Sequence, residues 1–372
     1  MLEKEQKYIL HVMGMDSTKY GGIERFNVAL ARSLLEKGFI SIFIYESLPM
    51  NHSYIEDLTD SKAIITVSNA RNRPLHFCKD VYMLIRQYRP ILVHAHFTKA
   101  RFYAIPLASW MGVKKLYFTI HSMMDPIENI KPITKLWYWK ANKIAKVIAV
   151  SDDIENTYRK NWPTANIERI YLGVPYPSEE RLISRKKLGL SEDQMMLLCI
   201  ANFNHIKGLD ILIKAAAILK EGGLGNDKTL LYIVGQPQQD IDALKEDIDR
   251  LGLTQVVNLI GISNIVPTYI AASDIYIQPS RSEGTPLSLM ESASYSLPLI
   301  GSRIGGIPEV ISDGDNGIIV EPGNEMQLAS AIKTLILDSE MRTEFGQKSY
   351  QFFKEKFTID NGVKQTLNYY NL

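Results

Sequence analysis

The chain has 372 residues, 46% of them hydrophobic, which is too long for one ordinary core and favours two domains of similar size. No stretch approaches the roughly 20 apolar residues of a membrane span, and the charged start MLEKEQKYILHV lacks the pattern of a signal peptide, so we expect a cytoplasmic protein. The net charge is only +1, and two distant cysteines, Cys78 and Cys199, predict neither a disulfide nor a metal cluster.

Short apolar runs alternate with amphipathic helical patterns along the whole chain. This alternation is typical of βαβ units and predicts parallel sheets with helices on both faces. The predicted strands of the first half are YILHVMG, ISIFIY, AIITV, ILVHAHF, KLYFTIH and KVIAVS. Those of the second half are MMLLCIANF, LLYIVG, VVNLIG, IYIQPS, PLIGS and GIIVE.

Both halves begin alike, with a strand, a polar turn and a helix, so we expect two doubly wound domains in tandem. The boundary falls in IYLGVPYPSEE, residues 170–180, where two prolines and a glycine interrupt the pattern. We therefore assign residues 1–173 to one domain and 174–354 to the other. The aromatic tail, about 355–372, is expected to pack back on the first domain. Two such domains facing each other would form a cleft for a ligand.

The charge is distributed unevenly between these halves. Residues 1–175 carry 24 Lys and Arg against 16 Asp and Glu, a net charge of +8, whereas the remainder carries 18 against 25, or −7. A basic first domain suggests an anionic partner, either nucleic acid or a membrane surface.

The segment SRSEGTPLSLMES, residues 280–292, places Glu283 before an expected helix start and Glu291 about two turns later, roughly 12 Å away. Pro286 suits the first turn of that helix. The backbone amides of Thr285, Leu287 and Ser288 would face an anion beyond the strand end, and a phosphate fits there. The two carboxylates would accept hydrogen bonds from ligand hydroxyls. Alone, the same pattern also fits an ordinary helix with two solvated acids.

Short sequence elements recur in a definite order along nearly the whole chain. These are GGIERF, HAHF, FTIHS, VIAVS, the KG of HIKG, IVG, AASDIYIQPS, the Glu283–Glu291 pair, and GSRIGGIPEVISDGDNGIIVEP. In the number, order and spacing of these elements, the sequence resembles the retaining glycosyltransferases of family 4, which have the two-domain GT-B fold.

The resemblance assigns roles to individual positions. Glu283 would hold hydroxyls of the donor sugar, Glu291 the ribose hydroxyls, and the amides of Thr285 to Ser288 the distal phosphate. Gly284 belongs to the same donor-binding segment. Lys207 would neutralise the diphosphate as it leaves. In the first domain, Gly21 and Gly22 would let the backbone approach the diphosphate, although a simple turn fits them too.

His121 matches the family histidine that faces the donor sugar, and a neutral imidazole there would bind a sugar hydroxyl. We rank His94 and His96 below it, because a histidine near a strand end is more often a core group. We place the nucleobase near Gly261 and Ile262.

The chain departs from the family pattern at three positions. Asn202 stands where the family usually has a second diphosphate cation, and Arg281 and Arg303 are candidates to replace it. Leu172 replaces the usual linker asparagine. Pro286 replaces a common glycine and removes one possible amide donor.

Two acidic segments resemble metal sites only superficially. SDGDNG, residues 312–317, lacks the later ligands of a calcium loop and is read as a tight turn. Asp152 and Asp153 follow Ser151 and are read as a capped helix start. We therefore expect no metal and no cofactor.

The segment KPITKLWYWKANKIAKV, residues 131–147, combines five lysines with aromatic rings. It fits a helix that lies on anionic lipid, or equally a helix with its rings in the core. No nucleic-acid-binding motif accompanies the charge, so a membrane is the preferred partner. The residues assigned to this surface are Lys135, Trp137, Trp139, Lys140 and Lys143.

We therefore expect a metal-independent retaining glycosyltransferase at the inner face of the cytoplasmic membrane. Its donor would be a UDP-hexose or UDP-N-acetylhexosamine, with GDP-mannose second. Its acceptor would be a lipid-linked glycan of bacterial polysaccharide, O-antigen or lipopolysaccharide biosynthesis. One rival, a nicotinamide-dependent dehydrogenase, lacks its glycine fingerprint in GMDSTKYGGIE. Another is a non-catalytic sugar-nucleotide or glycan-binding protein, which Asn202 keeps open.

Overall fold

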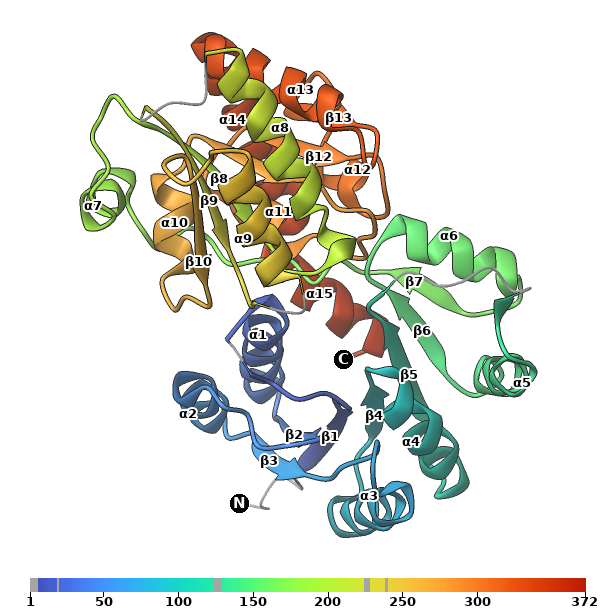
Figure 1. Cartoon of the computed structure of the whole chain (residues 1–372). Coiled ribbons are helices and arrows are strands. Elements are labelled where there is room, and N and C mark those ends of the chain that lie inside the picture. The colour runs from blue at the N-terminus through green and yellow to red at the C-terminus, as the bar shows by residue number, and fades with distance from the viewer. Residues whose placement is uncertain (1–5, 19, 123–128, 224–227, 238–239) are drawn as a thin grey trace. The chain divides into compact units, whose positions relative to one another are not determined.

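A computed structural model describes residues 6–18, 20–122, 129–223, 228–237 and 240–372 (Figure 1). The chain divides into two compact units, which are described separately below. Unit 1 consists of Met1–Gly173 together with Ile359–Leu372, and unit 2 consists of Val174–Thr358.

Unit 1 is built on a seven-stranded sheet in the order β3-β2-β1-β4-β5-β6-β7, and all its strand pairs are parallel. Its strands are β1 (Lys7–Val12), β2 (Phe39–Tyr45), β3 (Ile64–Val67), β4 (Leu92–Ala95), β5 (Lys115–Ile120), β6 (Lys146–Ala149) and β7 (Ile167–Arg169). Its helices are α1 (Gly22–Glu36), α2 (His52–Asp60), α3 (Pro74–Tyr88), α4 (Thr98–Trp110), α5 (Pro132–Ala141), α6 (Asp152–Asn161) and α15 (Ile359–Tyr370).

Unit 2 repeats the pattern with a parallel six-stranded sheet in the order β10-β9-β8-β11-β12-β13. Its strands are β8 (Met195–Ile200), β9 (Thr229–Val234), β10 (Val257–Gly261), β11 (Ile275–Gln278), β12 (Leu299–Ser302) and β13 (Gly317–Val320). Its helices are α7 (Arg181–Lys187), α8 (Leu209–Glu221), α9 (Ile241–Arg250), α10 (Val266–Ala272), α11 (Leu287–Ser294), α12 (Ile307–Val310), α13 (Glu325–Leu337) and α14 (Ser339–Phe352). Short helical segments cover His205–Lys207 (η2) and Phe353–Phe357 (η3).

The predicted fold class, two doubly wound parallel sheets, is confirmed, and each of the twelve predicted strands is present. The sequence reading missed β7, because Ile-Glu-Arg has only one apolar residue and no alternation to reveal it. In both sheets the first strand lies beside the fourth, β1 beside β4 and β8 beside β11, so the winding direction reverses there. Ligands of open parallel sheets bind at the strand ends beside this reversal.

Helix packing explains why these strands are so apolar. Leu212, Ile213 and Ala215 of α8 and Ile332 and Leu335 of α13 are buried in one core cluster with the strands of unit 2. The helices α8 and α13 contact each other over that sheet (Figure 1). Because helices cover the sheet, only its edges remain for polar chemistry.

The last helix, α15, packs on unit 1. The hydroxyl of Tyr369 donates to the carbonyl of Val147 in β6, and the hydroxyl of Tyr117 in β5 donates to the carbonyl of Tyr369. Lys115 donates to the carbonyl of Tyr370 at 2.9 Å. The C-terminal aromatic residues are therefore part of the unit 1 core.

Candidate functional site

The candidate site of unit 2 lies where the chain leaves β8 and β11, the two strands beside the reversal point. Lys207 lies in η2 after β8, and Glu283 lies in the loop between β11 and α11. Their side chains meet, with Nζ of Lys207 2.8 Å from Oε2 of Glu283. The structure thus brings together two predicted site residues that are 76 positions apart.

Gly208 allows this close approach. Its φ of +65° lies in the left-handed region, and a Cβ on it would lie 2.0 Å from the carbonyl oxygen of Pro279. The amide of Arg281 donates to the carbonyl of Ile206 at 2.8 Å. The η2 segment and the loop after β11 therefore form one packed layer beside the end of the sheet.

Glu283 is held by one of its two carboxylate oxygens. Oε2 accepts hydrogen bonds from Lys207, from the amide of Gln278 at 3.2 Å and from the hydroxyl of Ser280 at 3.3 Å. Its side chain is 10% exposed, and Oε1 accepts a hydrogen bond from none of the described residues. This arrangement fixes the carboxylate and leaves one oxygen to accept from a ligand hydroxyl.

The two arginines considered as substitutes for a second diphosphate cation are engaged elsewhere. Arg281 forms a bidentate ion pair with Asp210, with both nitrogen–oxygen distances 2.7 Å, and it donates to the carbonyl of His205. Arg303 pairs with Glu321 at 3.0 Å. Asn202 follows β8 and is half-buried, so Lys207 is the cation that the structure places beside Glu283.

Helix α11 begins at Leu287, after Glu283 as expected, and Pro286 is the residue before its first turn. The prediction of a free amide at Leu287 is wrong, because that amide donates to the carbonyl of Thr285 at 2.9 Å, closing a tight turn. The amide of Ser288 donates to none of the described residues. Gly284 and Glu291 are both half-buried, before the helix and in its second turn respectively.

Gly21 and Gly22 form the start of α1 in unit 1. The amide of Gly21 donates to Oε2 of the buried Glu24 at 3.1 Å, and the hydroxyl of Ser17 donates to Oε1 of the same carboxylate at 2.9 Å. One buried carboxylate therefore accepts hydrogen bonds from both Ser17 and Gly21.

His121 follows β5 and belongs to a group of histidines at the strand ends of unit 1. Nε2 of His121 lies 3.1 Å from Nδ1 of His96, and its ring stacks on Phe97 with centroids 4.6 Å apart. His94 is buried, with Nε2 2.7 Å from the hydroxyl of Thr119 and Nδ1 bonded to the hydroxyl of Tyr370. The sequence reading of His94 as a satisfied core group is thus confirmed, whereas His96 contacts the candidate site residue.

These imidazoles are held neutral. Burial lowers the pKa of His96 to about 3, and burial together with the neighbouring His96 lowers the pKa of His11 to about 3. Burial lowers the pKa of His121 well below 6.5, and His96 and the buried Arg101 lower it further. At neutral pH, His121 therefore acts as a hydrogen-bonding group and not as a cation.

The nitrogens of His11, His94 and His96 lie within 4.8 Å of one another, a spacing that a metal ion could span. Both nitrogens of His94, however, are already in hydrogen bonds. A metal would have to displace Thr119 or Tyr370, so this group is better described as a packed polar cluster in the core.

The positions predicted for the nucleobase lie at the end of β10 in unit 2. Gly261 ends β10 with φ of +69°, and Ile262 beside it is 69% exposed.

Trp137 of α5 packs inward: its ring stacks on Phe102, and its Nε1 donates to the carbonyl of Phe102 at 3.2 Å. Trp137 is therefore not part of an exposed face.

The other residues assigned to the membrane surface are exposed or half-buried. Trp139, Lys140 and Lys143 are exposed, and Lys135 is half-buried. The ammonium of Lys143 lies 3.6 Å above the ring of Trp139.

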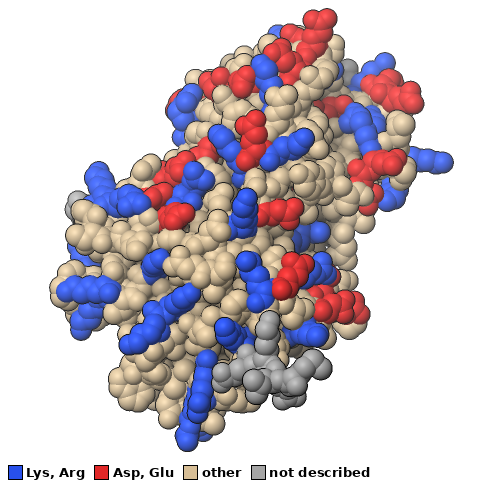
Figure 2. Space-filling view, turned by 180° about the vertical axis from the view of Figure 1, so that it is seen from behind, with Lys and Arg blue, Asp and Glu red and all other residues tan. Residues whose placement is uncertain are grey.

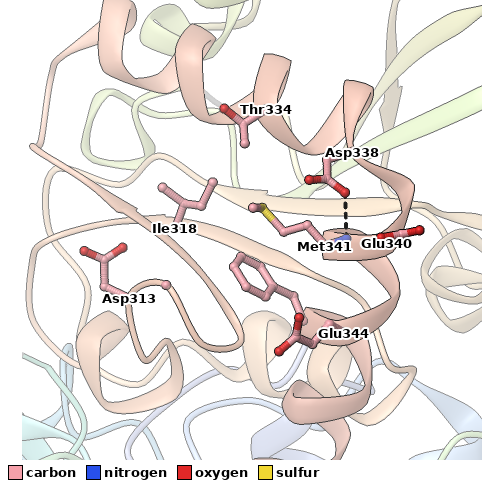
Figure 3. A pocket seen from close by; sticks show the side chains of 9 residues that line it. Asp313, Ile318, Thr334, Asp338, Glu340, Met341 and Glu344 are labelled. Carbon is pink, nitrogen blue, oxygen red and sulfur yellow. Dashed lines mark hydrogen bonds between the residues drawn. The ribbon is translucent and has the colours of Figure 1, made fainter.

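A cavity of about 490 Å³ in unit 2 is a different feature (Figure 3). Asp313 and Gly314, which line it, precede β13, so it lies at the opposite edge of the parallel sheet from Lys207 and Glu283. Its residues are Asp313, Gly314, Ile318, Thr334, Asp338, Glu340, Met341, Glu344 and Phe345. Four carboxylates would repel a diphosphate, so this cavity does not fit a nucleotide.

Comparison with known proteins finds relatives of both units. The model described as "Glycosyl transferases group 1" matches residues 180–352, and that of "Glycosyltransferase Family 4" matches residues 20–176. The chain is 25% identical to the N-acetyl-alpha-D-glucosaminyl L-malate synthase of Bacillus anthracis, over 93% of this chain and 92% of that protein. It is 27% identical to the lipopolysaccharide glucosyltransferase WaaG of Escherichia coli, over 58% of this chain and 59% of WaaG.

Among solved structures, HepE of Anabaena in complex with UDP superimposes with a TM-score of 0.81 at 20% identity, covering 97% of this chain and 99% of that one. The same protein has also been solved with UDP-glucose. At this identity the likeness shows the fold, which is that of two Rossmann-like domains.

Proposed function

Because the chain belongs to the family 4 glycosyltransferases and has their GT-B fold, we propose that it transfers a sugar from a nucleoside diphosphate donor bound by unit 2. A UDP-hexose or UDP-N-acetylhexosamine is the preferred donor, and GDP-mannose is the second candidate. The single observation that carries the proposal is the Lys207–Glu283 pair at the reversal point of the sheet, with one carboxylate oxygen left for a ligand.

The pair suits a diphosphate leaving group. A phosphate beside Lys207 shares the ammonium with Glu283, and the charge that grows on the departing diphosphate strengthens that contact. Glu283 meanwhile accepts from a sugar hydroxyl through Oε1. The roles of Glu291 at the ribose and of Gly21 and Gly22 at the diphosphate are parts of the same proposal.

We propose retention of anomeric configuration. The acceptor oxygen bonds to the anomeric carbon on the face from which the diphosphate leaves, and the acceptor proton passes to the leaving phosphate. No metal takes part in this scheme. An NMR spectrum of the product reports the anomer, and full activity after EDTA treatment is the expected result; inversion or an activity restored only by added metal would contradict these two points.

The donor proposal is tested by calorimetry with a panel of nucleotide sugars, followed by turnover with the best binder and membrane extract as acceptor source. Glu283→Ala should abolish transfer and leave UDP binding largely intact, because the carboxylate binds the sugar. Lys207→Ala should lower kcat by about 10²- to 10³-fold, the usual effect of removing one group that stabilises transition-state charge.

The matched control is Glu340→Gln, an exposed carboxylate at the remote acidic cavity, which should leave both measurements unchanged. Unchanged turnover in Glu283→Ala would remove Glu283 from the site. Binding of UDP without any release of UDP in the presence of acceptor would favour the alternative, a non-catalytic sugar-nucleotide-binding protein.

We further propose that unit 1 meets an anionic membrane, where a lipid-linked or lipopolysaccharide glycan is the acceptor. Ile133, Leu136 and Trp139 of α5 are 69%, 47% and 53% exposed. Lys140 is exposed on the same helix, and the ammonium of Lys143 lies 3.6 Å above the ring of Trp139. Over the face drawn in Figure 2, Lys and Arg predominate on unit 1, in the lower part of the view. Apolar rings among lysines fit the headgroup region of anionic lipid. No described helix is long and apolar enough to span a membrane.

Sedimentation with vesicles tests this surface. Phosphatidylglycerol vesicles should retain the protein and phosphatidylcholine vesicles should not, and Leu136→Glu with Trp139→Glu should release it. Leu182→Glu is the control, because Leu182 is 73% exposed on α7 of unit 2. Equal binding to both lipids, or equal loss in the control, would refute the membrane proposal.

A further inference from the structure

The histidines of unit 1 carry an inference about how His121 is presented to a ligand, and it rests on the function proposed above. His121 is held on two sides: Phe97 stacks on its ring with an interplanar angle of 15°, and His96 bonds its Nε2. Its Nδ1 forms no hydrogen bond with the described residues. Nδ1 is therefore the atom available to a sugar.

The contact between two neutral imidazoles has a direction. One nitrogen carries the proton and donates, and the other accepts. If Nε2 of His121 donates, His96 must carry its own proton on Nε2, where it is buried and has no partner among the described residues. If Nδ1 of His96 donates, only a lone pair on its Nε2 is left unpaired. Buried N–H groups without a partner are rarer than underused acceptors, so the second arrangement is favoured.

We propose that His96 is a positioning residue that donates to Nε2 of His121, so that His121 carries its proton on Nδ1 and donates a hydrogen bond to an oxygen of the donor sugar. His121 is then a donor of fixed orientation and not a base for the acceptor hydroxyl. Arg101 supports the neutral state of His121, since its buried guanidinium disfavours a second proton on that ring.

The tautomer can be read directly by long-range ¹H–¹⁵N NMR of the full-length protein labelled on histidine, with the His121 signals assigned from His121→Phe. The expected spectrum shows a proton on Nδ1 and none on Nε2. A proton on Nε2 would overturn the proposal. This measurement needs no substrate, so it remains decisive even if no donor is turned over and the proposed transfer fails.

Three substitutions of His96 test the consequence for catalysis. Asn keeps an amide that donates near the position of Nδ1, Leu removes the donor, and Asp accepts only and should move the His121 proton to Nε2. Transfer should fall less than about threefold with Asn and about tenfold with Leu, the effect of one lost hydrogen bond. The Asp variant should lose at least as much transfer activity as the Leu variant, and its His121 NMR signals should shift.

Controls separate positioning from folding. The Asn and Leu variants should have similar Tm values in thermal unfolding. In a His121→Phe background, the change His96→Leu should cause no further loss of transfer. Equal activity of the Asn and Leu variants, or an undiminished effect of His96→Leu without His121, would show that His96 acts only in packing.

Discussion

Gly208 sets the distance between Lys207 and Glu283, and Gly208→Ala tests whether that distance matters. The new Cβ would lie 2.0 Å from the carbonyl oxygen of Pro279 and 3.0 Å from its carbon. Ordinary contact requires about 3.5 Å, so η2 must retreat from the strand end by more than about 1 Å. The left-handed backbone adds about 1–2 kcal/mol of strain for any residue with a Cβ.

Gly189→Ala is a matched control for the backbone term alone. Gly189 lies in the same unit with φ of +69°, and its added Cβ would meet nothing within 4 Å. Both variants should therefore lose about 1–2 kcal/mol of stability to backbone strain. Each kcal/mol lowers Tm by about 2–4 °C in a unit of this size. A catalytic group misplaced by 1 Å loses about 10²-fold in rate, so only Gly208→Ala should show that additional loss of transfer.

The assay pairs thermal unfolding with release of UDP from the preferred donor, at a temperature where both variants are folded. Transfer by Gly208→Ala equal to that of Gly189→Ala would refute the reasoning. So would a crystal structure of Gly208→Ala in which the 2.8 Å contact between Lys207 and Glu283 is kept.

Two further predictions concern loop order and pH. Arg281→Lys cannot keep both 2.7 Å contacts to Asp210, so the loop holding Lys207 should exchange its amide hydrogens faster. The loss of stability should be only about 0.5–1 kcal/mol because the ion pair is partly exposed. Unchanged exchange at Lys207, whose amide donates to the carbonyl of Asn204 at 3.0 Å, would contradict this. Burial lowers the pKa of His11 to about 3, so its contribution to the stability of unit 1 is complete above pH 6.5 and falls by about 1.4 kcal/mol per pH unit below it. When the pH is lowered from 7.5 to 5, the free energy of unfolding should therefore fall by about 2 kcal/mol less in His11→Phe than in the unsubstituted chain. Urea unfolding followed by tryptophan fluorescence measures this, since all four tryptophans lie in unit 1, and equal losses would refute it.

The fold was predictable because apolar runs and their spacing decide it. The strand IYIQPS, the proline after it and the helix start at Leu287 follow from local preferences that tertiary packing did not overrule. The position of Glu283 beside the strand end follows from the same pattern.

Other parts of the site depend on pairing between distant segments, which no local pattern encodes. Arg281 was a candidate for the diphosphate, but Asp210, 71 residues earlier, binds it. Gln278 and Ser280 were missed as partners of Glu283; the available signal was two polar side chains at the buried end of a strand. Helical phase predicts the inward position of Trp137, since it lies one turn before the buried Ala141.

The return of α15 to unit 1 fixes an order of assembly during synthesis. Unit 2 is one continuous segment and can finish folding as soon as residue 358 has left the ribosome. The N-terminal unit is made first but lacks the hydroxyl that Tyr370 supplies to His94 and the ring that Tyr369 packs on Tyr117. The core of unit 1 can therefore be completed only after α15 has been synthesised.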